Sequence, residues 1–278
     1  MRLLADKHIQ YIQSLDQFSI SSHRHLRING VYWGLTSTLL LDRPGGLPRQ
    51  EMIDWVMSCW EPDSGGFRPH PGHDPHIHST LSAIQILTMQ DSLHVIDKPK
   101  VMNCLALLGG LDKLDRDAVI GFISRCQNFD GGFGMVEGAE SHAAYVWTCV
   151  GTLAILDRLD IVDANTLGWW LSERQVPNGG LNGRPEKLED VCYSWWALAS
   201  LVIIGKSEWI DRSKLTSSYY HDPDSGGIAD RPDDMPDVWH TVFGLAGLSM
   251  LGYEGLKPVD PVFCMPAQFT KGLVKVTS

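Results

Sequence analysis

Three side chains of the kinds that bind a catalytic zinc ion lie at equivalent places in two neighbouring stretches of the sequence. When the chain is aligned on its Gly-Gly pairs, residues 190–193 (Asp-Val-Cys-Tyr) match residues 237–240 (Asp-Val-Trp-His). Zinc accepts a mixed set of carboxylate, thiolate and imidazole, and its catalytic sites keep a fourth position open. Asp190, Cys192 and His240 are therefore candidate zinc ligands. The alternative is structural: a helix cap, a small buried thiol and a hydrogen-bonded imidazole.

A pair of cations precedes the first of these stretches. Arg184 and Lys187 lie in the loop that ends at Asp190, and His142 and Tyr193 are expected near the same rim of the fold. Arginine binds phosphate oxygens as a fork and lysine as a point charge, so this group is typical of a diphosphate site. The alternative is a solvated loop in which both cations pair with neighbouring glutamates.

Aromatic residues are concentrated in the predicted helices below this rim. Ten Trp residues in 278 is a high number. Side chains that face the axis of a ring of helices would line a deep apolar funnel, although plain core packing is the usual reason for such a pattern. The aromatic residues in question are Tyr32, Trp33, Tyr145, Trp147, Trp195, Trp196 and Phe243.

A repeat of helical hairpins is expected to position these residues. Gly-Gly pairs begin at Gly65, Gly131, Gly179 and Gly226, separated by 66, 48 and 47 residues. A nearly all-apolar helix follows each pair, and an amphipathic helix led by Asp precedes the later pairs. Stacked hairpins with an apolar inner ring and an amphipathic outer ring predict an all-α fold, an α/α barrel or toroid, without convincing strands. The predicted inner helices include 26–41, 143–155, 191–204 and 238–251, and the outer ones 7–14, 117–127, 164–175 and 212–220.

One interval breaks the period. Two repeats would place about 96 residues between the first two glycine pairs, yet there are 66, so roughly thirty residues of one hairpin are missing. The segment 101–108 looks like the start of an outer helix joined directly to the end of an inner one, which puts the break near Asn103. We therefore expect a single domain over residues 1–278, with five hairpins and the remnant of a sixth.

Composition limits the classes of function. The formal charge is −10, from 23 Lys and Arg against 33 Asp and Glu, which argues against a nucleic-acid or anionic-membrane binder. The six cysteines form no CxxC motif, and no signal peptide or membrane-spanning stretch is evident. A reduced, cytoplasmic location is expected.

Several long motifs resemble the β subunits of protein prenyltransferases, above all those of type II (Rab) geranylgeranyltransferases. They are residues 179–187 (GGLNGRPEK), 190–196 (DVCYSWW) and 128–134 (NFDGGFG). The stretch from Ser21 to Leu41 and the tail 261–266 match as well. The likeness covers nearly the whole chain, and it implies an α/α barrel with a catalytic zinc ion and a geranylgeranyl diphosphate funnel.

The resemblance also implies a role for each site residue. Zinc is held by Asp190, Cys192 and His240, and the substrate thiolate binds as a further ligand before it attacks the isoprenoid. The diphosphate and isoprenoid are bound by His142, Arg184, Lys187, Tyr193 and Trp196. A carboxylate at Asp230 is linked to Mg²⁺, and Asn29 and Leu81 lie near the tunnel floor.

The partners implied are a helical-repeat α subunit, a Rab escort protein and a Rab-type small GTPase, whose C-terminal cysteines receive geranylgeranyl groups. Two other classes stay open. The first is a binding scaffold that has lost turnover through the missing hairpin. The second is a different α/α-barrel enzyme, a glycosidase or a terpene cyclase, which would need acid groups such as Asp233-Asp234 or Asp222 with Asp224, although these look like turns.

Overall fold

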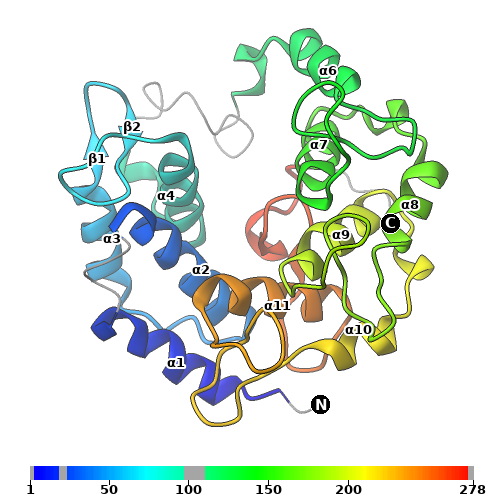
Figure 1. Ribbon diagram of the computed structural model, residues 1–278. Helices are drawn as coiled ribbons and strands as arrows, with labels where there is room; N and C mark the ends of the chain where they lie inside the picture. Colours follow the sequence, from blue (N-terminus) through cyan, green and yellow to red (C-terminus); the bar gives the residue numbers. More distant parts are fainter. Residues whose placement is uncertain (1–2, 19–23, 97–109, 275–278) are drawn as a thin grey trace.

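The fold is a ring of paired helices (Figure 1). A computed structural model describes residues 3–18, 24–96 and 110–274. These residues form five consecutive pairs, each with an outer and an inner helix. The outer helices are α1 (Ala5–Phe18), α3 (Arg49–Ser58), α6 (Arg116–Arg125), α8 (Ala164–Ser172) and α10 (Arg212–Ser218). The inner helices are α2 (Arg27–Leu40), α4 (Ile77–Met89), α7 (Ala143–Ile155), α9 (Tyr193–Ile203) and α11 (Val238–Met250). The prediction of an all-α hairpin barrel is confirmed.

The core lies between the inner helices and the ring around them. The inner helices pack on one another in the order α4, α2, α11, α9 and α7. Their sequences are apolar nearly all round, as a helix covered on several sides must be; in α11 the residues from Thr241 to Leu248 are buried without interruption. Short 3-10 helices join or follow the pairs. They are η1 (Arg24–Leu26), η2 (Leu93–Val95), η4 (Leu111–Lys113), η5 (Leu159–Ile161), η6 (Ser207–Trp209) and η7 (Ala267–Phe269).

Local sequence signals set where the helices begin and end. The carboxylates of Asp115, Asp163 and Asp211 accept hydrogen bonds from the first amides of α6, α8 and α10, as N-cap residues do. Gly205 and Gly252 follow α9 and α11 with φ of 69° and 75°, the left-handed conformation that ends many helices. Both features were predicted from the sequence.

Each of the later glycine pairs packs closely against the backbone of the next outer helix. A Cβ atom on Gly131 would lie 2.7 Å from the Leu167 amide of α8, and one on Gly179 would lie 2.5 Å from the Lys214 carbonyl of α10. A Cβ atom on Gly226 would lie 2.4 Å from the Lys7 carbonyl of α1. Only glycine allows such an approach at a positive φ. Because α1 packs against the last glycine pair in the same way, it closes the ring between the first and last helix pairs.

The expectation that the chain has no strands needs a small correction. Strands β1 (Trp60–Glu61) and β2 (Gly66–Phe67) pair antiparallel, as do β3 (Val259–Asp260) and β4 (Met265–Pro266). Isolated bridges of the same kind flank the later glycine turns. A tight turn brings the chain back beside itself, and its free backbone groups then pair across two residues. Such short ladders carry no period-2 pattern that a sequence could reveal.

Of the neighbouring inner helices that the structure describes, α4 and α7 have the fewest contacts with each other. Among the described residues these two helices do not pack on each other as the other neighbouring inner helices do, and Figure 1 shows them on either side of an interval. The C-terminal segment, residues 259–274, contacts both helices. Its Phe263 carbonyl accepts a hydrogen bond from Gln85 of α4, and its Pro261 carbonyl accepts one from Trp147 of α7. The predicted break near Asn103 lies outside the described residues.

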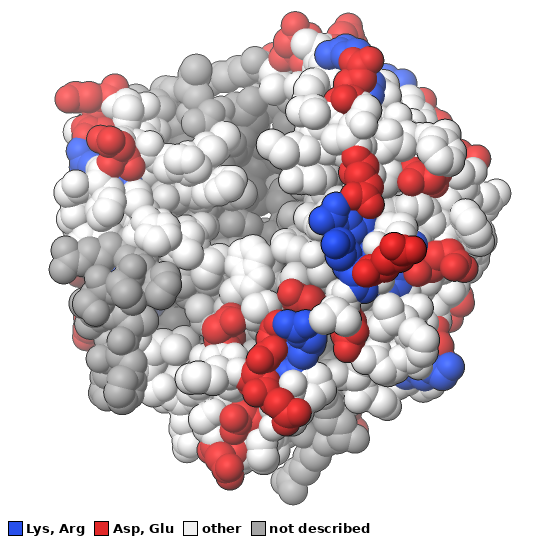
Figure 2. All heavy atoms as spheres, in the orientation of Figure 1, with Lys and Arg blue, Asp and Glu red and all other residues white. Residues whose placement is uncertain are grey.

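No helix in the described part of the chain combines the length and the apolar character that a membrane crossing requires. The charged side chains on the face seen in Figure 2 are unevenly spread. Lys and Arg gather over the starts of α9 and α11, next to acidic residues, while the described residues beside the central hollow are largely uncharged.

Candidate functional site

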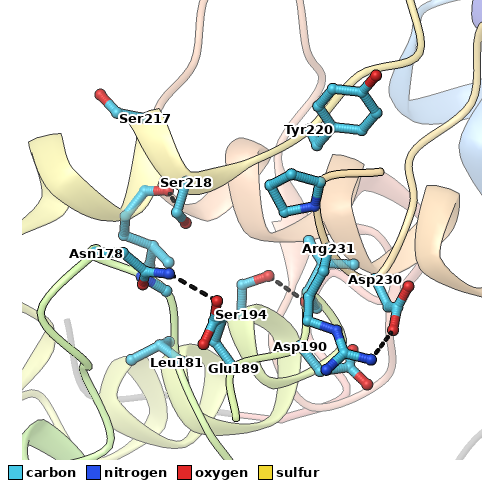
Figure 3. A pocket seen from close by; sticks show the side chains of 14 residues that line it. Asn178, Leu181, Glu189, Asp190, Ser194, Ser217, Ser218, Tyr220, Asp230 and Arg231 are labelled. Atoms are coloured by element: carbon cyan, nitrogen blue, oxygen red, sulfur yellow. Dashed lines mark hydrogen bonds and ion pairs between the residues drawn. The ribbon is translucent and has the colours of Figure 1, made fainter. Parts of the chain in front are cut away.

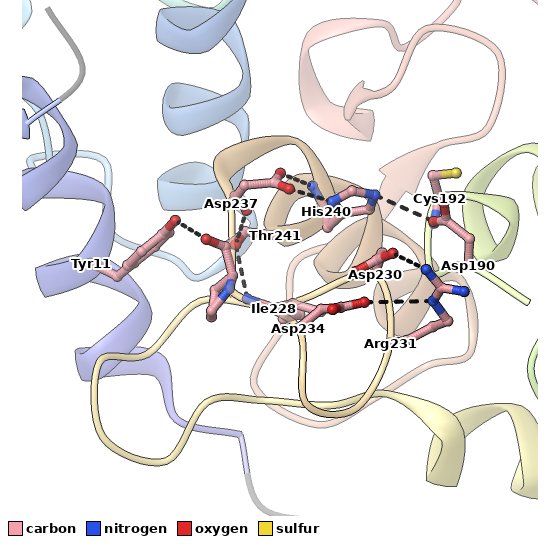
Figure 4. Close-up of polar contacts among 11 residues, drawn as sticks. Tyr11, Asp190, Cys192, Ile228, Asp230, Arg231, Asp234, Asp237, His240 and Thr241 are labelled. Carbon is pink, nitrogen blue, oxygen red and sulfur yellow. Dashed lines mark hydrogen bonds and ion pairs between the residues drawn. The ribbon is translucent and has the colours of Figure 1, made fainter.

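The three predicted metal ligands converge at the starts of α9 and α11 (Figure 4). One donor atom from each of Asp190, Cys192 and His240 lies within 4.8 Å of the other two. Asp190 Oδ1 is 3.4 Å from His240 Nε2. The same oxygen accepts the amide hydrogen of Cys192 at 2.8 Å, which turns the thiol and the carboxylate to one side. The site joins two repeats, because the amide of Val191 also donates to the carbonyl of Asp230 at 3.1 Å.

Asp237 holds the imidazole in place, a role that the sequence interpretation missed. Its Oδ1 accepts the His240 amide at 2.8 Å, which caps α11, and its Oδ2 contacts His240 Nδ1. A carboxylate oxygen only accepts, so Nδ1 carries a proton and Nε2 is directed at Asp190 and Cys192. A carboxylate behind a ligating histidine is the usual support of a zinc ligand. The spacing of Asp237 and His240, three residues apart at the start of a predicted helix, is the signal that could have revealed this role.

The charges of the three donors favour a bound cation. Burial raises the pKa of Asp190, but hydrogen bonds from His240 and Cys192 outweigh it and the pKa is lowered. Burial lowers the pKa of His240, but Asp190 and Asp237 outweigh it and raise the pKa to about 9. Burial and the nearby Asp190 raise the pKa of the Cys192 thiol. The protein alone therefore keeps protons on sulfur and imidazole, and a divalent cation that displaced them would satisfy all three groups. The donor set fits zinc.

The predicted diphosphate residues lie beside this centre. His142 caps α7, its Nδ1 accepting the Ala144 amide at 3.2 Å, so that its Nε2 carries the proton. Nε2 is 3.4 Å from the Tyr193 hydroxyl, and the two rings are 5.6 Å apart. Burial lowers the pKa of His142, with the charge of Arg184 acting in the same direction. Burial, followed by the nearby Cys192, raises the pKa of Tyr193 to about 12. Both groups are thus neutral hydrogen-bonding groups near pH 7.

The loop that carries Arg184 and Lys187, here called the cation loop, contacts both α7 and α9. Its Gly183 carbonyl accepts the Ala143 amide of α7 at 2.9 Å. A Cβ atom on Gly183 would lie 2.4 Å from the Tyr193 ring of α9, so only glycine lets the tyrosine lie under the loop. Arg184 is paired with Glu140. Lys187 is exposed, and the described residues offer it no ion pair. That position 183 requires glycine was not predicted from the sequence.

Aromatic rings continue inward from Tyr193, whose ring is 5.5 Å from that of Trp196. Trp196 in turn lies 5.8 Å from Trp239, which is 4.8 Å from Trp33. Trp239 was not among the predicted lining residues. Trp195 was, but it is fully buried and belongs to the core.

Another predicted lining residue, Tyr32, is also core. It is buried, and its hydroxyl donates to the Cys264 carbonyl of the C-terminal segment at 2.6 Å. Two residues expected near the tunnel floor lie on α2 and α4. Asn29 donates to the Ser82 hydroxyl at 2.9 Å, and Leu81 is 40% exposed.

Asp230, the expected magnesium carboxylate, lies next to the three donors but pairs with Arg231 at 3.2 Å. Arg231 also contacts Asp234 at 3.6 Å. Asp222 accepts the amides of its own turn at 2.8 Å. These acids therefore have structural partners, and they do not form the facing pair that a glycosidase needs.

A cavity of about 240 Å³ opens on the outer side of the centre (Figure 3). It lies between the end of α10, the start of α9 and the loop before α11, and the side chains of Asp190, Asp230 and Arg231 line it. The carboxylate of Asp190, one of the three candidate metal ligands, is thus part of the lining of this cavity.

Comparisons with known proteins identify the family of the chain. The prenyltransferase alpha-alpha toroid domain family matches residues 3–109 and 101–265. The geranylgeranyl transferase type-2 subunit beta of Saccharomyces cerevisiae is 44% identical, over 99% of this chain and 98% of that one. The Candida albicans protein of the same name is 40% identical over 53% of this chain and 56% of its own. The solved structure of Candida albicans protein geranylgeranyltransferase-I complexed with GGPP has a TM-score of 0.85, at 23% identity over 99% of this chain and 100% of that chain, which shows a common fold.

The same comparisons bear on the shortened repeat. The alignment to the yeast protein spans 317 positions, 39 more than the 278 residues of this chain, so the chain lacks residues that its relative has. The two matches to the toroid family overlap over residues 101–109, and the broken period places the gap near Asn103 in this stretch. The chain therefore belongs to the prenyltransferase alpha-alpha toroid family and is related, along its whole length, to the β subunits of type-2 geranylgeranyl transferases.

Proposed function

We propose that this chain is the catalytic β subunit of a Rab geranylgeranyltransferase. It would transfer a geranylgeranyl group from geranylgeranyl diphosphate to C-terminal cysteines of Rab-type small GTPases. The observation that carries the proposal is the convergence of Asp190, Cys192 and His240, whose donor atoms lie within 4.8 Å of one another beside the cation loop. The names of its relatives support the geranylgeranyl group, and the Rab-type acceptor is what the resemblance of the sequence motifs implies.

The chain's own residues divide the chemistry between two neighbouring groups. Asp190, Cys192 and His240 would hold one zinc ion per chain. When bound, the ion supplies a positive charge that lowers the pKa of a substrate thiol, so that a thiolate is present at neutral pH. In the overall reaction the substrate sulfur forms a bond to C1 of the isoprenoid, the C1–O bond breaks, and diphosphate leaves with the electron pair.

The second group stabilises the leaving diphosphate. The Nε2–H of His142 and the hydroxyl of Tyr193 are neutral donors, and Arg184 and Lys187 bring two positive charges in the loop above them. Negative charge on the diphosphate grows as the C1–O bond breaks, so these contacts strengthen in the transition state. Trp196 extends inward from Tyr193 and offers an apolar wall to the isoprenoid.

The partners follow from the same family. An α subunit would complete a heterodimer, a Rab escort protein would present the GTPase, and the prenylated product would gain a membrane anchor. A cytoplasmic location and a role for Mg²⁺ at Asp230 stay predictions.

The missing residues support one competing function, a scaffold that binds partners without turnover. The observation in its favour is that, over the part of the chain that the structure describes, α4 and α7 do not pack on each other as the other neighbouring inner helices do.

Reconstitution separates these two functions. The full chain, co-expressed with its α subunit, is given labelled geranylgeranyl diphosphate, a Rab-type GTPase and escort protein, and zinc content is measured on the same sample. Stoichiometric zinc with a labelled thioether on the GTPase supports the enzyme. Stoichiometric zinc without transfer supports the scaffold.

A further inference from the structure

Helix α1 docks on the loop that joins α10 to α11 through a fully buried histidine, His8. Its Nδ1 accepts the Gly227 amide hydrogen at 2.9 Å, so its Nε2 carries the proton and donates to His221 Nδ1, also at 2.9 Å. Lys7, one residue earlier, donates to the Pro223 carbonyl. This loop leads directly into the metal centre, so α1 contacts the polypeptide that supplies His240 and its carboxylate.

Tyr11, on the next turn of α1, fixes the peptide that precedes Asp237 (Figure 4). Its ring lies against Gly227, where an added Cβ atom would be 3.0 Å away. Its hydroxyl donates to the Pro236 carbonyl at 2.7 Å. That carbonyl and the Asp237 amide belong to one planar unit, and the amide donates to the Ile228 carbonyl at 3.4 Å. The peptide plane is therefore fixed by one hydrogen bond at its carbonyl, from Tyr11, and by another at its amide, to Ile228.

The orientation of this plane decides where the Asp237 carboxylate lies. One of its oxygens caps α11 by accepting the amide hydrogen of His240, and the other accepts a hydrogen bond from Nδ1 of the His240 ring. A rotation of the plane would move the carboxylate and free the ring to turn. The sequence of contacts thus runs from Tyr11 through the Pro236 peptide and Asp237 to the nitrogen that faces Asp190.

We propose that Tyr11 is a positioning residue of the metal centre: through the Pro236–Asp237 peptide, α1 fixes the His240 ring for metal binding. This inference rests on the proposed zinc site and goes beyond it, because it places a determinant of metal affinity on an outer helix some 230 residues earlier in the chain. The competing account is a purely structural role for α1, which closes the ring by packing against Gly226.

A pair of matched variants distinguishes the two accounts. Tyr11→Phe removes only the hydroxyl and keeps the ring on Gly227. Gln13→Leu is the control, since Gln13 lies on the same helix but donates to the Gly46 carbonyl at 2.9 Å, in the loop after α2. For the full chain and both variants, Co²⁺ affinity is measured by competition with a chelator, together with the visible absorption of the bound ion and the melting temperature of the metal-free protein.

We expect Tyr11→Phe to bind Co²⁺ roughly 3- to 10-fold more weakly, somewhat less than the 10–100-fold typical when a direct partner of a ligand is lost. Its absorption bands should shift, while Gln13→Leu keeps both affinity and spectrum. Equal affinity and identical spectra in all three proteins would overturn the inference, and so would an equal loss in both variants. Absence of Co²⁺ binding by the unmodified chain would refute the proposed zinc site, and this inference with it.

Discussion

Replacing Asp237 by asparagine separates the two functions that this residue performs. Asparagine can still accept the His240 amide, so the cap of α11 should be kept, and the free energy of unfolding should fall by less than about 1 kcal/mol. The ring of His240 loses its charged partner, and its Nε2 is no longer held toward Asp190. The variant should therefore fold but bind zinc poorly.

The size of the effect follows from the position of Asp237 directly behind a ligand. Loss of such a partner typically costs 10–100-fold in metal affinity, which is about 1.4–2.8 kcal/mol. Asp211→Asn is the matched control, because Asp211 caps α10 in the same way but has no contact with the metal donors. Zinc affinity is measured with a chromophoric chelator, and unfolding with urea on the metal-free proteins.

The pH dependence of the metal-free protein gives a second readout of the same change. The pKa of His240 is raised from 6.5 to about 9 by carboxylates that outweigh its burial. A raised pKa in the folded state stabilises the fold fully below pH 6.5, and that contribution is lost as pH rises through about 9. Asp237→Asn removes one carboxylate, so its stability should fall less over this interval. Unchanged zinc affinity and an unchanged pH profile would refute the assignment of Asp237.

Three further changes test the rest of the site. Cys192→Ala should abolish prenyl transfer while circular dichroism shows the helical fold intact; persistent transfer would remove this residue from the ligand set. Joint replacement of Arg184 and Lys187 by alanine should weaken binding of inorganic diphosphate at least about tenfold by calorimetry, and unaltered binding would mean that the diphosphate site lies elsewhere. Gly183→Ala places a methyl group against the Tyr193 ring and should cost about 1–3 kcal/mol in thermal unfolding, with slower transfer; wild-type stability and rate would show that the loop yields easily.

The architecture was predictable because its signals are local and repeated. The glycine pairs recur at a nearly constant period, and Asp115, Asp163 and Asp211 mark helix starts with the chemistry that a cap requires. The packing of each outer helix against the preceding glycine pair was not predictable. It depends on a contact between two repeats that no sequence pattern indicates. The short strands escaped for a similar reason, since two paired residues leave no pattern.

The convergence of Asp190, Cys192 and His240 was predictable because all three lie at the starts of inner helices in two adjacent repeats. Asp237, three residues before His240, could have been found from its spacing, but the more distant residues that support the site could not. Gly183 matters through its close approach to the Tyr193 ring, Trp239 through rings of other repeats, and Tyr11 through a loop at the other end of the chain. Donor types and spacing thus indicate where chemistry occurs, whereas the groups that orient the donors become evident only when the ring closes.

The most direct test of the account is the coordination of zinc in the full chain. X-ray absorption at the zinc edge should show one sulfur at about 2.3 Å and nitrogen or oxygen ligands at about 2.0–2.2 Å, with one zinc per chain. The sulfur should disappear in Cys192→Ala. A zinc environment without sulfur in the unmodified chain, or a chain that binds no zinc, would contradict the central claim that Asp190, Cys192 and His240 form a thiol-activating metal site.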